Sequence, residues 1–224
     1  ERHEPTSAVI LAGGGSRRLG QDKRRLRLWG DAGPTLLERT LALAAALCDD
    51  VLVVLNDPQA WPELPARIVA DRYPGAGALG GIATGLAAAR APHALVLACD
   101  LPLLNPQLLA AMLARPRDYD ALLPRSPLPG AARNGMDVEP LHAIYAAACR
   151  PALEAALARG ERQVAAALAP LRLAIVERDE IRRHDPHGRS CFNLNTPAQL
   201  AAVLQLIGEP PAARDAPSAD PAAL

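Results

Sequence analysis

A short apolar run that breaks into three consecutive glycines constrains the fold of this chain most strongly. The run is Ala8–Leu11; Gly13–Gly15 follow it, and then a basic stretch that ends at Asp22-Lys23. The apolar run predicts a buried strand, and the glycines predict a sharp turn whose backbone N–H groups are left unshielded by side chains. Such amides beside basic side chains form a site for a polyphosphate. We therefore expect a nucleotide-binding loop at the carboxyl end of the first strand, where open α/β sheets bind ligands.

Two better-known phosphate-binding loops do not fit this segment. The Walker pattern would use Gly15 and Gly20, but Gln21 stands where its lysine should be. The dinucleotide fingerprint GxGxxG would begin at Gly13, but Arg18 stands at the position of its third glycine. The segment is therefore a Gly-rich loop of another kind, or a plain turn after a strand.

Composition excludes several classes of protein. The formal net charge is zero, which gives no overall attraction to nucleic acid or to an anionic membrane. Aromatic residues make up only 3% of the chain, which argues against platforms for base stacking. The four cysteines lack CxxC spacing and predict buried, reduced thiols instead of a disulfide framework or a zinc site. Because no apolar stretch approaches the ~20 residues that span a bilayer and the start has no signal-peptide core, we expect a cytoplasmic protein.

Short apolar runs alternate with longer segments of helical pattern. We expect strands at Ser7–Ala12, Val51–Leu55, Arg67–Ala70, Ala94–Ala98, Ala121–Leu123, Leu141–Tyr145 and Arg172–Val176. We expect helices at Thr35–Leu47, Gly80–Ala89, Pro106–Ala114, Ala146–Ala158 and Pro197–Ile207. This alternation predicts a three-layer α/β fold, with a mostly parallel central sheet and helices on both faces.

Residues 7–207 are expected to form a single domain. The preceding residues 1–6 are predicted to be a disordered end, and 208–224 a disordered tail whose proline and alanine residues cannot bury a core. Residues 124–139 hold three prolines and two glycines with little apolar pattern, so they predict a surface loop or a lid.

An aspartate follows the fourth predicted strand. Ala94–Ala98 leads through Cys99 into Asp100, and Pro102 ends the regular structure. An aspartate at the carboxyl end of a parallel strand faces the same crevice as the Gly-rich loop. Magnesium takes one or two carboxylates together with substrate phosphates and waters. Asp100 is therefore a candidate magnesium ligand; the alternative is a cap of the next helix, a role that Asn105 is equally able to fill.

Two more polar residues follow predicted strands. Asp71 comes after Arg67–Ala70, where its carboxylate is able to accept hydrogen bonds from the N1 and N2 groups of guanine. Asn56 comes after Val51–Leu55, where its amide is able to contact a base. Both residues fit simple turns as well, and the sequence Asn-Asp-Pro at 56–58 is common in turns.

The segment FNLNTP at 192–197 predicts the start of a helix. Asn195 and Thr196 are capping residues, and Pro197 suits the first helical turn. Whether Asn193 and Asn195 also bind a ligand stays open at this point.

Other polar groups favour structural roles. Residues 160–164 (GERQV) predict a solvated turn, and His142 lies in an alternating apolar run that predicts a core or edge position. His184 and His187 lie in a polar loop with Asp185, where we do not expect a metal site.

These motifs together resemble the molybdenum cofactor guanylyltransferase family, within the wider Rossmann-like nucleotidyltransferases. The matching segments are LAGGGSRRLGQDK at 11–23, DRYPGAGALGGI at 71–82, CDLP at 99–102, EPLHAIY at 139–145, GERQV at 160–164 and FNLNTP at 192–197. Gly13-Gly14 resembles the guanylyl-transferring members, since the related cytidylyltransferases usually have Ala-Ala-Gly there. Arg24-Arg25 departs from the small or apolar residues that are commoner in the family, and the 124–138 loop is longer and richer in proline.

The resemblance implies that GMP is transferred from GTP to the terminal phosphate of molybdenum-molybdopterin, with release of pyrophosphate and with Mg²⁺ as cofactor. It implies transient contacts with molybdenum-insertion and acceptor proteins, and no nucleic-acid or membrane partner. By this resemblance the GTP-binding residues are Leu11, Ala12, Gly13, Gly14, Lys23, Asn56, Asp71 and Asp100. The implied catalytic residues are Lys23, Asp100 and Arg18, with the metal on Asp100, and the implied molybdopterin-binding residues are Arg18, Asn193 and Asn195.

Other functions remain open from the sequence. The same chemistry would serve a cytidylyltransferase for the same cofactor or a sugar-phosphate nucleotidyltransferase. A non-catalytic nucleotide-binding module would use the Gly-rich loop only for sensing. A carrier of the metal cofactor would need neither Lys23 nor Asp100, and the presence of both argues against it.

Overall fold

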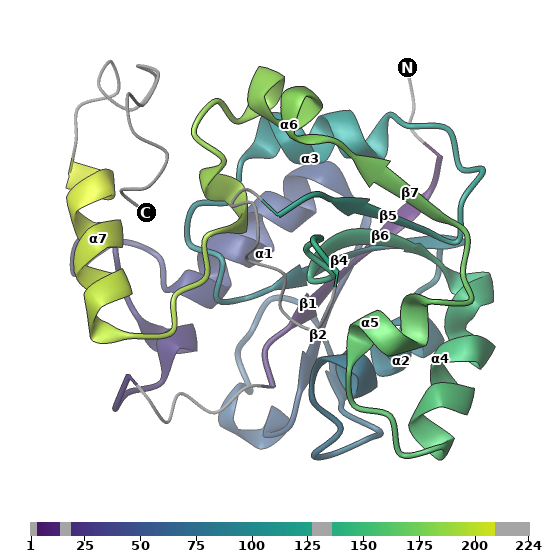
Figure 1. The fold of residues 1–224 in the computed structure, drawn as a ribbon. Helices are drawn as coiled ribbons and strands as arrows, with labels where there is room; N and C mark the ends of the chain where they lie inside the picture. The colour runs from purple at the N-terminus through teal and green to yellow at the C-terminus, as the bar shows by residue number, and fades with distance from the viewer. Residues whose placement is uncertain (1–3, 14–18, 127–135, 209–224) are drawn as a thin grey trace.

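The computed structural model describes residues 4–13, 19–126 and 136–208. Within them, a seven-stranded sheet of order β3-β2-β1-β4-β6-β5-β7 lies at the centre of the molecule (Figure 1). Its strands are β1 (Thr6–Leu11), β2 (Asp50–Leu55), β3 (Arg67–Ala70), β4 (His93–Ala98), β5 (Ala121–Pro124), β6 (His142–Ala146) and β7 (Leu173–Val176). The strand β6 is antiparallel to its neighbours β4 and β5, and the other pairs are parallel.

Helices cover both faces of this sheet. They are α1 (Leu36–Leu47), α2 (Gly77–Ala88), α3 (Pro106–Leu113), α4 (Arg150–Ala158), α5 (Val164–Leu168), α6 (Arg178–His184) and α7 (Pro197–Gly208). One apolar core contains side chains of α1, α3 and α6, and the core on the opposite face contains side chains of α2, α4 and α5. Among the described residues, none of these helices has the length and apolar character needed to cross a membrane.

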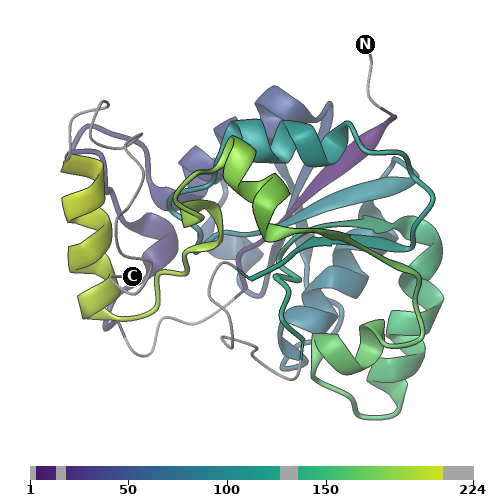
Figure 2. The same ribbon diagram turned by 45° about the horizontal axis from the view of Figure 1, so that its top comes forward.

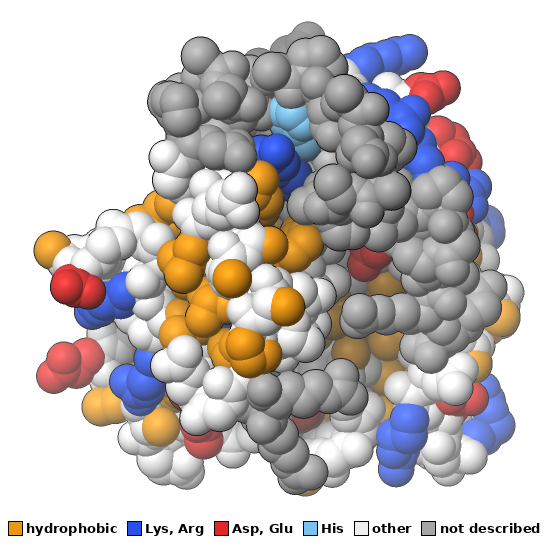
Figure 3. All heavy atoms as spheres, turned by 60° about the vertical axis from the view of Figure 1, so that its left-hand side comes forward, with side chains coloured by type: hydrophobic (Ala, Val, Ile, Leu, Met, Phe, Trp, Pro, Cys, Tyr) orange, Lys and Arg blue, Asp and Glu red, His pale blue; other side chains and the backbone are white. Residues whose placement is uncertain are grey.

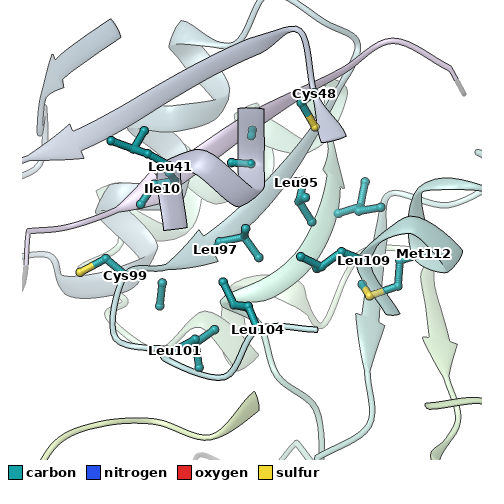
Figure 4. Close-up of a cluster of buried hydrophobic side chains, with 14 of the residues drawn as sticks. Ile10, Leu41, Cys48, Leu95, Leu97, Cys99, Leu101, Leu104, Leu109 and Met112 are labelled. Carbon is teal, nitrogen blue, oxygen red and sulfur yellow. The ribbon is translucent and has the colours of Figure 1, made fainter. Parts of the chain in front are cut away.

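The alternation of side chains along β1 divides them between the two cores. Ala8 and Ile10 belong to one cluster and Val9 to the other, because successive residues of a strand point to opposite faces. Figure 4 shows Ile10 near Leu41 of α1 in the first cluster, and Leu97 is the residue of β4 that pairs with Ile10. Each fully buried leucine or isoleucine of this kind contributes about 1.5–3 kcal/mol to folding.

The helix α7 belongs to neither of these layers. It lies to one side of the sheet, beside the segment that leads into α1 (Figure 2), and Figure 3 views the molecule from this side, with hydrophobic side chains among those at the surface. Val203 of α7 packs there with Leu28, Leu36 and Leu194 in a third, smaller cluster. This arrangement brings the segment just before α7 towards the carboxyl end of β4, where Leu194 N donates to the Asp100 carbonyl over 2.9 Å.

The predicted three-layer α/β fold is confirmed, and each predicted strand is present with ends shifted by at most one residue. The strand β1 begins at Thr6, one residue before its expected start, and α7 extends to Gly208. Residues 1–3 and 209–224, part of the predicted disordered ends, lie outside the described residues, as do 127–135 of the predicted loop.

Two predicted helices begin at other residues than expected, and two observed helices were not predicted. The helix expected over Ala146–Ala158 begins only at Arg150, since Ala146 still pairs with β4 and a 3₁₀ turn intervenes. The helix expected from Gly80 begins at Gly77 instead. Two short helices were not expected at all: α5, whose first residue Val164 lies in the predicted GERQV turn, and α6.

The helix α2 packs unusually close to β1. A Cβ added at Gly85 would lie 2.3 Å from Cγ1 of Val9, and one at Gly81 would lie 3.2 Å from Cδ2 of Leu11. Glycines in a helix interior cost stability, so their presence here is explained by this close contact. The approach brings the first turn of α2 to the carboxyl end of β1.

Candidate nucleotide site

A cavity of about 340 Å³ opens at the carboxyl ends of the parallel strands. The strand register explains its place, because Leu11 at the end of β1 pairs with Val54 of β2 and with Ala98 of β4. The residues that follow these strands therefore meet at one edge of the sheet. The cavity is lined by Leu11, Gly13, Lys23, Arg24, Val54, Asn56, Asp71, Gly75, Gly77, Ala78, Gly81, Ala98, Cys99, Asp100 and Leu141. Its volume lies in the range of small-ligand sites.

The backbone at the end of β1 is held on both sides. Ala12 N donates to the Val54 carbonyl over 3.0 Å, and Cys99 N donates to the Leu11 carbonyl over 3.1 Å. The Asn56 amide Nδ2 donates to the Gly13 carbonyl. A Cβ at position 13 would lie 2.9 Å from that nitrogen, so the close approach of Asn56 requires glycine there. The predicted residues Gly14 and Arg18 lie outside the described residues.

Lys23 joins three segments that are distant in the sequence. Its Nζ donates to Asp100 Oδ2 over 2.7 Å and to Asn195 Oδ1 over 2.8 Å. The Lys23 side chain is 13% exposed and that of Asp100 is 21% exposed, so the pair is shielded but reachable from the cavity. The structure thus brings together three of the residues that the sequence indicated, one of them from the motif that precedes α7.

One signal in the sequence points to Lys23 more strongly than its motif does. Lys23 is the only lysine in the chain. The other 23 of its 24 Lys and Arg residues are arginines. Lysine carries a compact charge on a flexible stem, whereas arginine presents a planar fork. The only lysine of the chain lies at the cavity, which indicates a position where a mobile point charge is needed.

The oxygen donors near Asp100 fit a metal ion that arrives with a phosphorylated ligand. The donors are the Asp100 carboxylate and the nearby Asn195 Oδ1, both within hydrogen-bond distance of Lys23 Nζ. In the part of the chain that the structure describes, no group of three or more His, Cys, Asp or Glu side chains forms a complete metal site. Magnesium does not need one, because phosphate oxygens and waters complete its shell.

Asp71 is oriented by a buried threonine. Its Oδ1 accepts from Tyr73 N over 2.9 Å and from Thr84 Oγ1 over 3.0 Å. Thr84 is fully buried in α2 and its hydroxyl also accepts from Arg72 N over 3.1 Å. With Oδ1 held in this way, Oδ2 is the oxygen that can accept from a ligand in the cavity. The positioning role of Thr84 was not apparent from the sequence.

Arg24 also lines the cavity, although the sequence indicated it only as a departure from the family. Its guanidinium forms ion pairs with Asp22 over 2.8 Å and with Asp57 over 2.6 Å. Hydrogen bonds from Arg24 lower the pKa of both carboxyl groups, so both are ionised at neutral pH. The residue next to Lys23 in the sequence is therefore held in a cluster of ionised groups.

The two asparagines of the FNLNTP segment have different surroundings. Asn193 donates from Nδ2 to the Cys191 carbonyl over 3.3 Å, a local contact, and it does not line the cavity. Asn195 reaches Lys23 with its side chain, while its backbone N donates to Gln199 Oε1 over 2.8 Å. Gln199 N in turn donates to Thr196 Oγ1, which confirms the predicted capping role of Thr196.

Histidine and cysteine side chains in the described residues have structural positions. His142 is buried, and burial lowers its pKa to about 4, as expected for a core histidine. Its Nε2 lies 2.7 Å from Ser190 Oγ.

The four cysteines are buried and free, as predicted. Burial raises the pKa of the Cys99 thiol to about 12, so this residue is not a nucleophile although it borders the cavity.

Comparison with known proteins gives a consistent set of relatives. The sequence pattern of the family described as "MobA-like NTP transferase domain" matches residues 8–173. A Chloroflexus aggregans protein named probable molybdenum cofactor guanylyltransferase is 48% identical over 207 residues, which cover 92% of this chain and 97% of the relative. A Pseudomonas syringae protein named molybdenum cofactor guanylyltransferase is 34% identical, covering 89% and 93% of the two chains.

Solved structures with a similar fold include one biosynthesis protein and one cytidylyltransferase. Molybdopterin-guanine dinucleotide biosynthesis protein A from Archaeoglobus fulgidus superposes with a TM-score of 0.75 at 26% identity, covering 90% of this chain and 98% of that one. The 2-C-methyl-D-erythritol 4-phosphate cytidylyltransferase from Thermus thermophilus superposes with a TM-score of 0.65 at 26% identity, covering 91% and 98%. This fold therefore serves transferases of more than one nucleotide.

Proposed function

The chain belongs to the MobA-like NTP transferase family, and from this membership we propose that it transfers GMP from GTP to the terminal phosphate of molybdenum-molybdopterin. Pyrophosphate is the second product. The proposal rests on relatives named as guanylyltransferases along nearly the whole chain. The observation that carries it is the cavity that places Lys23 and Asp100 together, with Asp71 in the same lining.

The reaction needs positioning and charge neutralisation more than proton transfer. The terminal phosphate of molybdopterin attacks the α-phosphate of GTP in line, and the bond to the β-phosphate oxygen breaks. Because the attacking phosphate is already ionised near neutral pH, no general base is required. In our proposal the Lys23 ammonium stabilises negative charge on the α-phosphate and on the leaving pyrophosphate.

The backbone at the end of β1 supplies further donors. We assign the contacts of Leu11, Ala12 and Gly13 with GTP to their backbone from the family resemblance; because Ala12 N already donates to the Val54 carbonyl, the amide of Gly13 is the donor that we assign to a phosphate. Gly14 is assigned to the same loop from the family resemblance. Preorganised amides that meet developing charge contribute a few kcal/mol each to transition-state stabilisation.

Nucleotidyltransferases of this kind typically need a divalent metal ion, and we propose that the ion is Mg²⁺ held by Asp100. When bound, the ion supplies positive charge to the phosphates that react and leave. The Asp100 carboxylate accepts from Lys23 Nζ, so Asp100 would share or release this contact when it holds a metal ion, and the Lys23 ammonium would then be able to reach a phosphate oxygen. Asn195 Oδ1 is close enough to hold the lysine during this exchange.

We place the guanine base against Asp71 and Asn56. Asp71 Oδ2 is the oxygen that accepts from the N1 and N2 groups, since Oδ1 is engaged by Tyr73 N and Thr84. Asn56 lines the same cavity while its Nδ2 holds the Gly13 carbonyl. We assign Arg18, Asn193 and Asn195 to the molybdopterin side. The contact of Asn195 with Lys23 supports our proposal that this side lies next to the phosphates.

The experiment that tests this function has two stages. The first measures thermal stabilisation of the protein by GTP, CTP, ATP and UTP, each with and without Mg²⁺. A ligand that binds only the folded form at 100 times its Kd adds about 2.7 kcal/mol to stability. The second measures pyrophosphate release from the preferred nucleotide when molybdenum-molybdopterin is added.

Each outcome separates the candidate functions. Selective stabilisation by GTP followed by acceptor-dependent pyrophosphate release is the expected result. Selective stabilisation by CTP would replace guanylyl with cytidylyl transfer and leave the chemistry intact. Nucleotide binding without pyrophosphate release would reduce the protein to a nucleotide-binding module.

A further inference from the structure

Arg24 forms a dense set of contacts at the rim of the cavity. Its Nη1 and Nη2 donate to Oδ1 and Oδ2 of Asp57 over 2.6 and 2.8 Å, a two-pronged pair. Its Nε donates to Asp22 Oδ1 over 2.9 Å, and Nη2 also donates to Asp22 Oδ2 over 2.8 Å. The Arg24 side chain is only 13% exposed and lies over Trp61, with its Cζ 5.1 Å from the ring centroid. A cation held this closely is a fixed part of the fold.

One further contact links Arg24 to the end of β1. Its Nη1 donates to the Ala12 carbonyl over 3.0 Å. Because a peptide unit is planar, a hydrogen bond that holds the Ala12 C=O also fixes the N–H of Gly13, which points to the opposite side. The next carbonyl, that of Gly13, is held by Asn56. Two successive carbonyls at the start of the Gly-rich loop are therefore bound by side chains.

The contacts of Arg24 also reach the other end of that loop. Asp22 caps the 3₁₀ turn Lys23–Arg25, and its Oδ1 accepts from Arg24 N over 3.0 Å. Arg24 thus bonds the residue before Lys23 and the residue before Gly13 at the same time. Asp57 adds the loop after β2 as a third anchor.

We propose that Arg24 is a positioning residue that holds the Gly13 peptide and Lys23 in fixed relation, so that both meet the phosphates of the bound nucleotide. This inference rests on the proposed function, since it assigns the phosphates to Gly13 and Lys23. Arg24 itself does not touch the nucleotide in this role. Its guanidinium is saturated by two carboxylates and a carbonyl, which leaves Lys23 as the cation that can change partners.

A planar guanidinium is needed for this arrangement. Arginine reaches two carboxylates and one carbonyl at once because its donors diverge from a rigid plane. A lysine at the same position keeps the charge but cannot bridge three acceptors in that geometry. If only the charge of Arg24 mattered, Arg24→Lys would behave like the wild type. If Arg24 acts by positioning, Arg24→Lys should behave like a variant that has lost the side chain.

The test compares GTP with guanosine, which has the same base and no phosphate. Binding of both ligands is measured by calorimetry for the wild type, Arg24→Met, Arg24→Lys and Asp57→Asn. We expect Arg24→Met and Arg24→Lys to weaken GTP binding about tenfold or more, as small displacements of positioned groups do. Guanosine binding should be weakened less than GTP binding, because Asp71, which we assign to the base, is held by Tyr73 N and Thr84 and has no contact with Arg24.

Arg25→Met is the matched control. Arg25 is the neighbouring arginine, stacks on the same Trp61 ring at 4.1 Å and donates to the Ala60 carbonyl, yet it does not line the cavity. We expect its GTP affinity to stay within about twofold of the wild type. Thermal unfolding of each variant checks that the fold survives.

Asp57→Asn separates positioning from direct contact with phosphate. Loss of the Asp57 charge frees Arg24, so direct contact predicts equal or tighter GTP binding, whereas positioning predicts weaker binding. This variant also carries the test if Arg24→Met does not fold.

Full GTP affinity in Arg24→Lys, or equal losses for GTP and guanosine, would overturn the inference. Failure of the wild type to prefer GTP or to release pyrophosphate would instead overturn the proposed function.

Discussion

The Lys23 Nζ lies 2.7 Å from Asp100 Oδ2, although 77 positions separate the two residues in the sequence. The same ammonium group lies 2.8 Å from Asn195 Oδ1. One lysine therefore connects the end of the Gly-rich segment, the carboxyl end of β4 and the segment before α7. In our proposal the nucleotide phosphates draw this ammonium group away from Asp100 and leave its carboxylate for the metal ion.

Lys23→Met should lower the rate of pyrophosphate release by about 100-fold or more, the size of effect seen when one preorganised donor is removed. The free energy of unfolding should fall by about 1–3 kcal/mol, because the pair is shielded and the substitution leaves the Asp100 carboxylate without its cation. Steady-state kinetics with molybdopterin as acceptor, together with the melting temperature, check both expectations. A variant that keeps more than a tenth of the wild-type rate would remove Lys23 from the mechanism.

The single lysine offers a direct view of the partner exchange. Reductive methylation with ¹³C should label the Lys23 amine as the one lysine signal, since the chain has no other lysine. We expect its NMR shift to move when GTP and Mg²⁺ are added together. An unchanged shift under saturating ligand would show that the ammonium stays on Asp100.

Thr84→Val should weaken GTP binding several-fold. The substitution keeps the shape of the side chain but removes the hydroxyl that holds Asp71 Oδ1, and a hydrogen bond of this kind is worth about 1–2 kcal/mol. Thr40→Val is the matched control, because the buried Thr40 hydroxyl bonds only to the Leu36 carbonyl inside α1. Calorimetry should show a loss of GTP affinity in the first variant alone, and equal losses in both would contradict the role of Thr84.

The alternation of short apolar runs with helical segments was sufficient to predict the strands and the mostly parallel character of the sheet, but not the order of its strands. The strands β1 and β4 are almost completely buried on both faces, and buried runs between helical segments give a clear signal. The helix α6 was not predicted, because Ile181 is its only buried residue and seven residues show no apolar period. Its acidic first turn and basic last turn were the available signals.

The residues of the candidate site that come directly after a strand could be predicted from the sequence. Asp71 and Asp100 follow the parallel strands β3 and β4 of one sheet, and the carboxyl ends of parallel strands lie at the same end of the sheet, so topology alone brings both residues to the cavity side. The contact between Lys23 and Asn195 could not be predicted in this way, because it depends on the path of the chain around the third apolar cluster. The contacts of Arg24 were hidden for a similar reason, since its partners lie in three separate loops.

Gly85→Ala should destabilise the fold by about 1–3 kcal/mol, the cost typical of overpacking a filled core. The new methyl group would lie 2.3 Å from Val9 Cγ1, so α2 or β1 would have to move. Gly208→Ala is the control, since a Cβ there meets no atom within 4 Å and should leave stability unchanged or slightly raised. Urea denaturation measures both variants, and a Gly85→Ala protein as stable as the wild type would contradict the observed packing.

His142 should make the protein lose stability as the pH falls from about 6.5 to 4. Burial lowers its folded pKa to about 4 from the ordinary 6.5, so between these values the unfolded chain binds a proton that the folded chain does not. Stability is then fully present above pH 6.5 and falls by up to about 1.4 kcal/mol per pH unit below it. His142→Gln, which has no titrating ring and retains a polar group towards Ser190, should remove this part of the pH dependence. Other groups, such as the buried Asp185, titrate in both proteins and cancel in the comparison. If urea denaturation at pH 7 and pH 5 gives the same loss for wild type and variant, His142 is not buried in its neutral form.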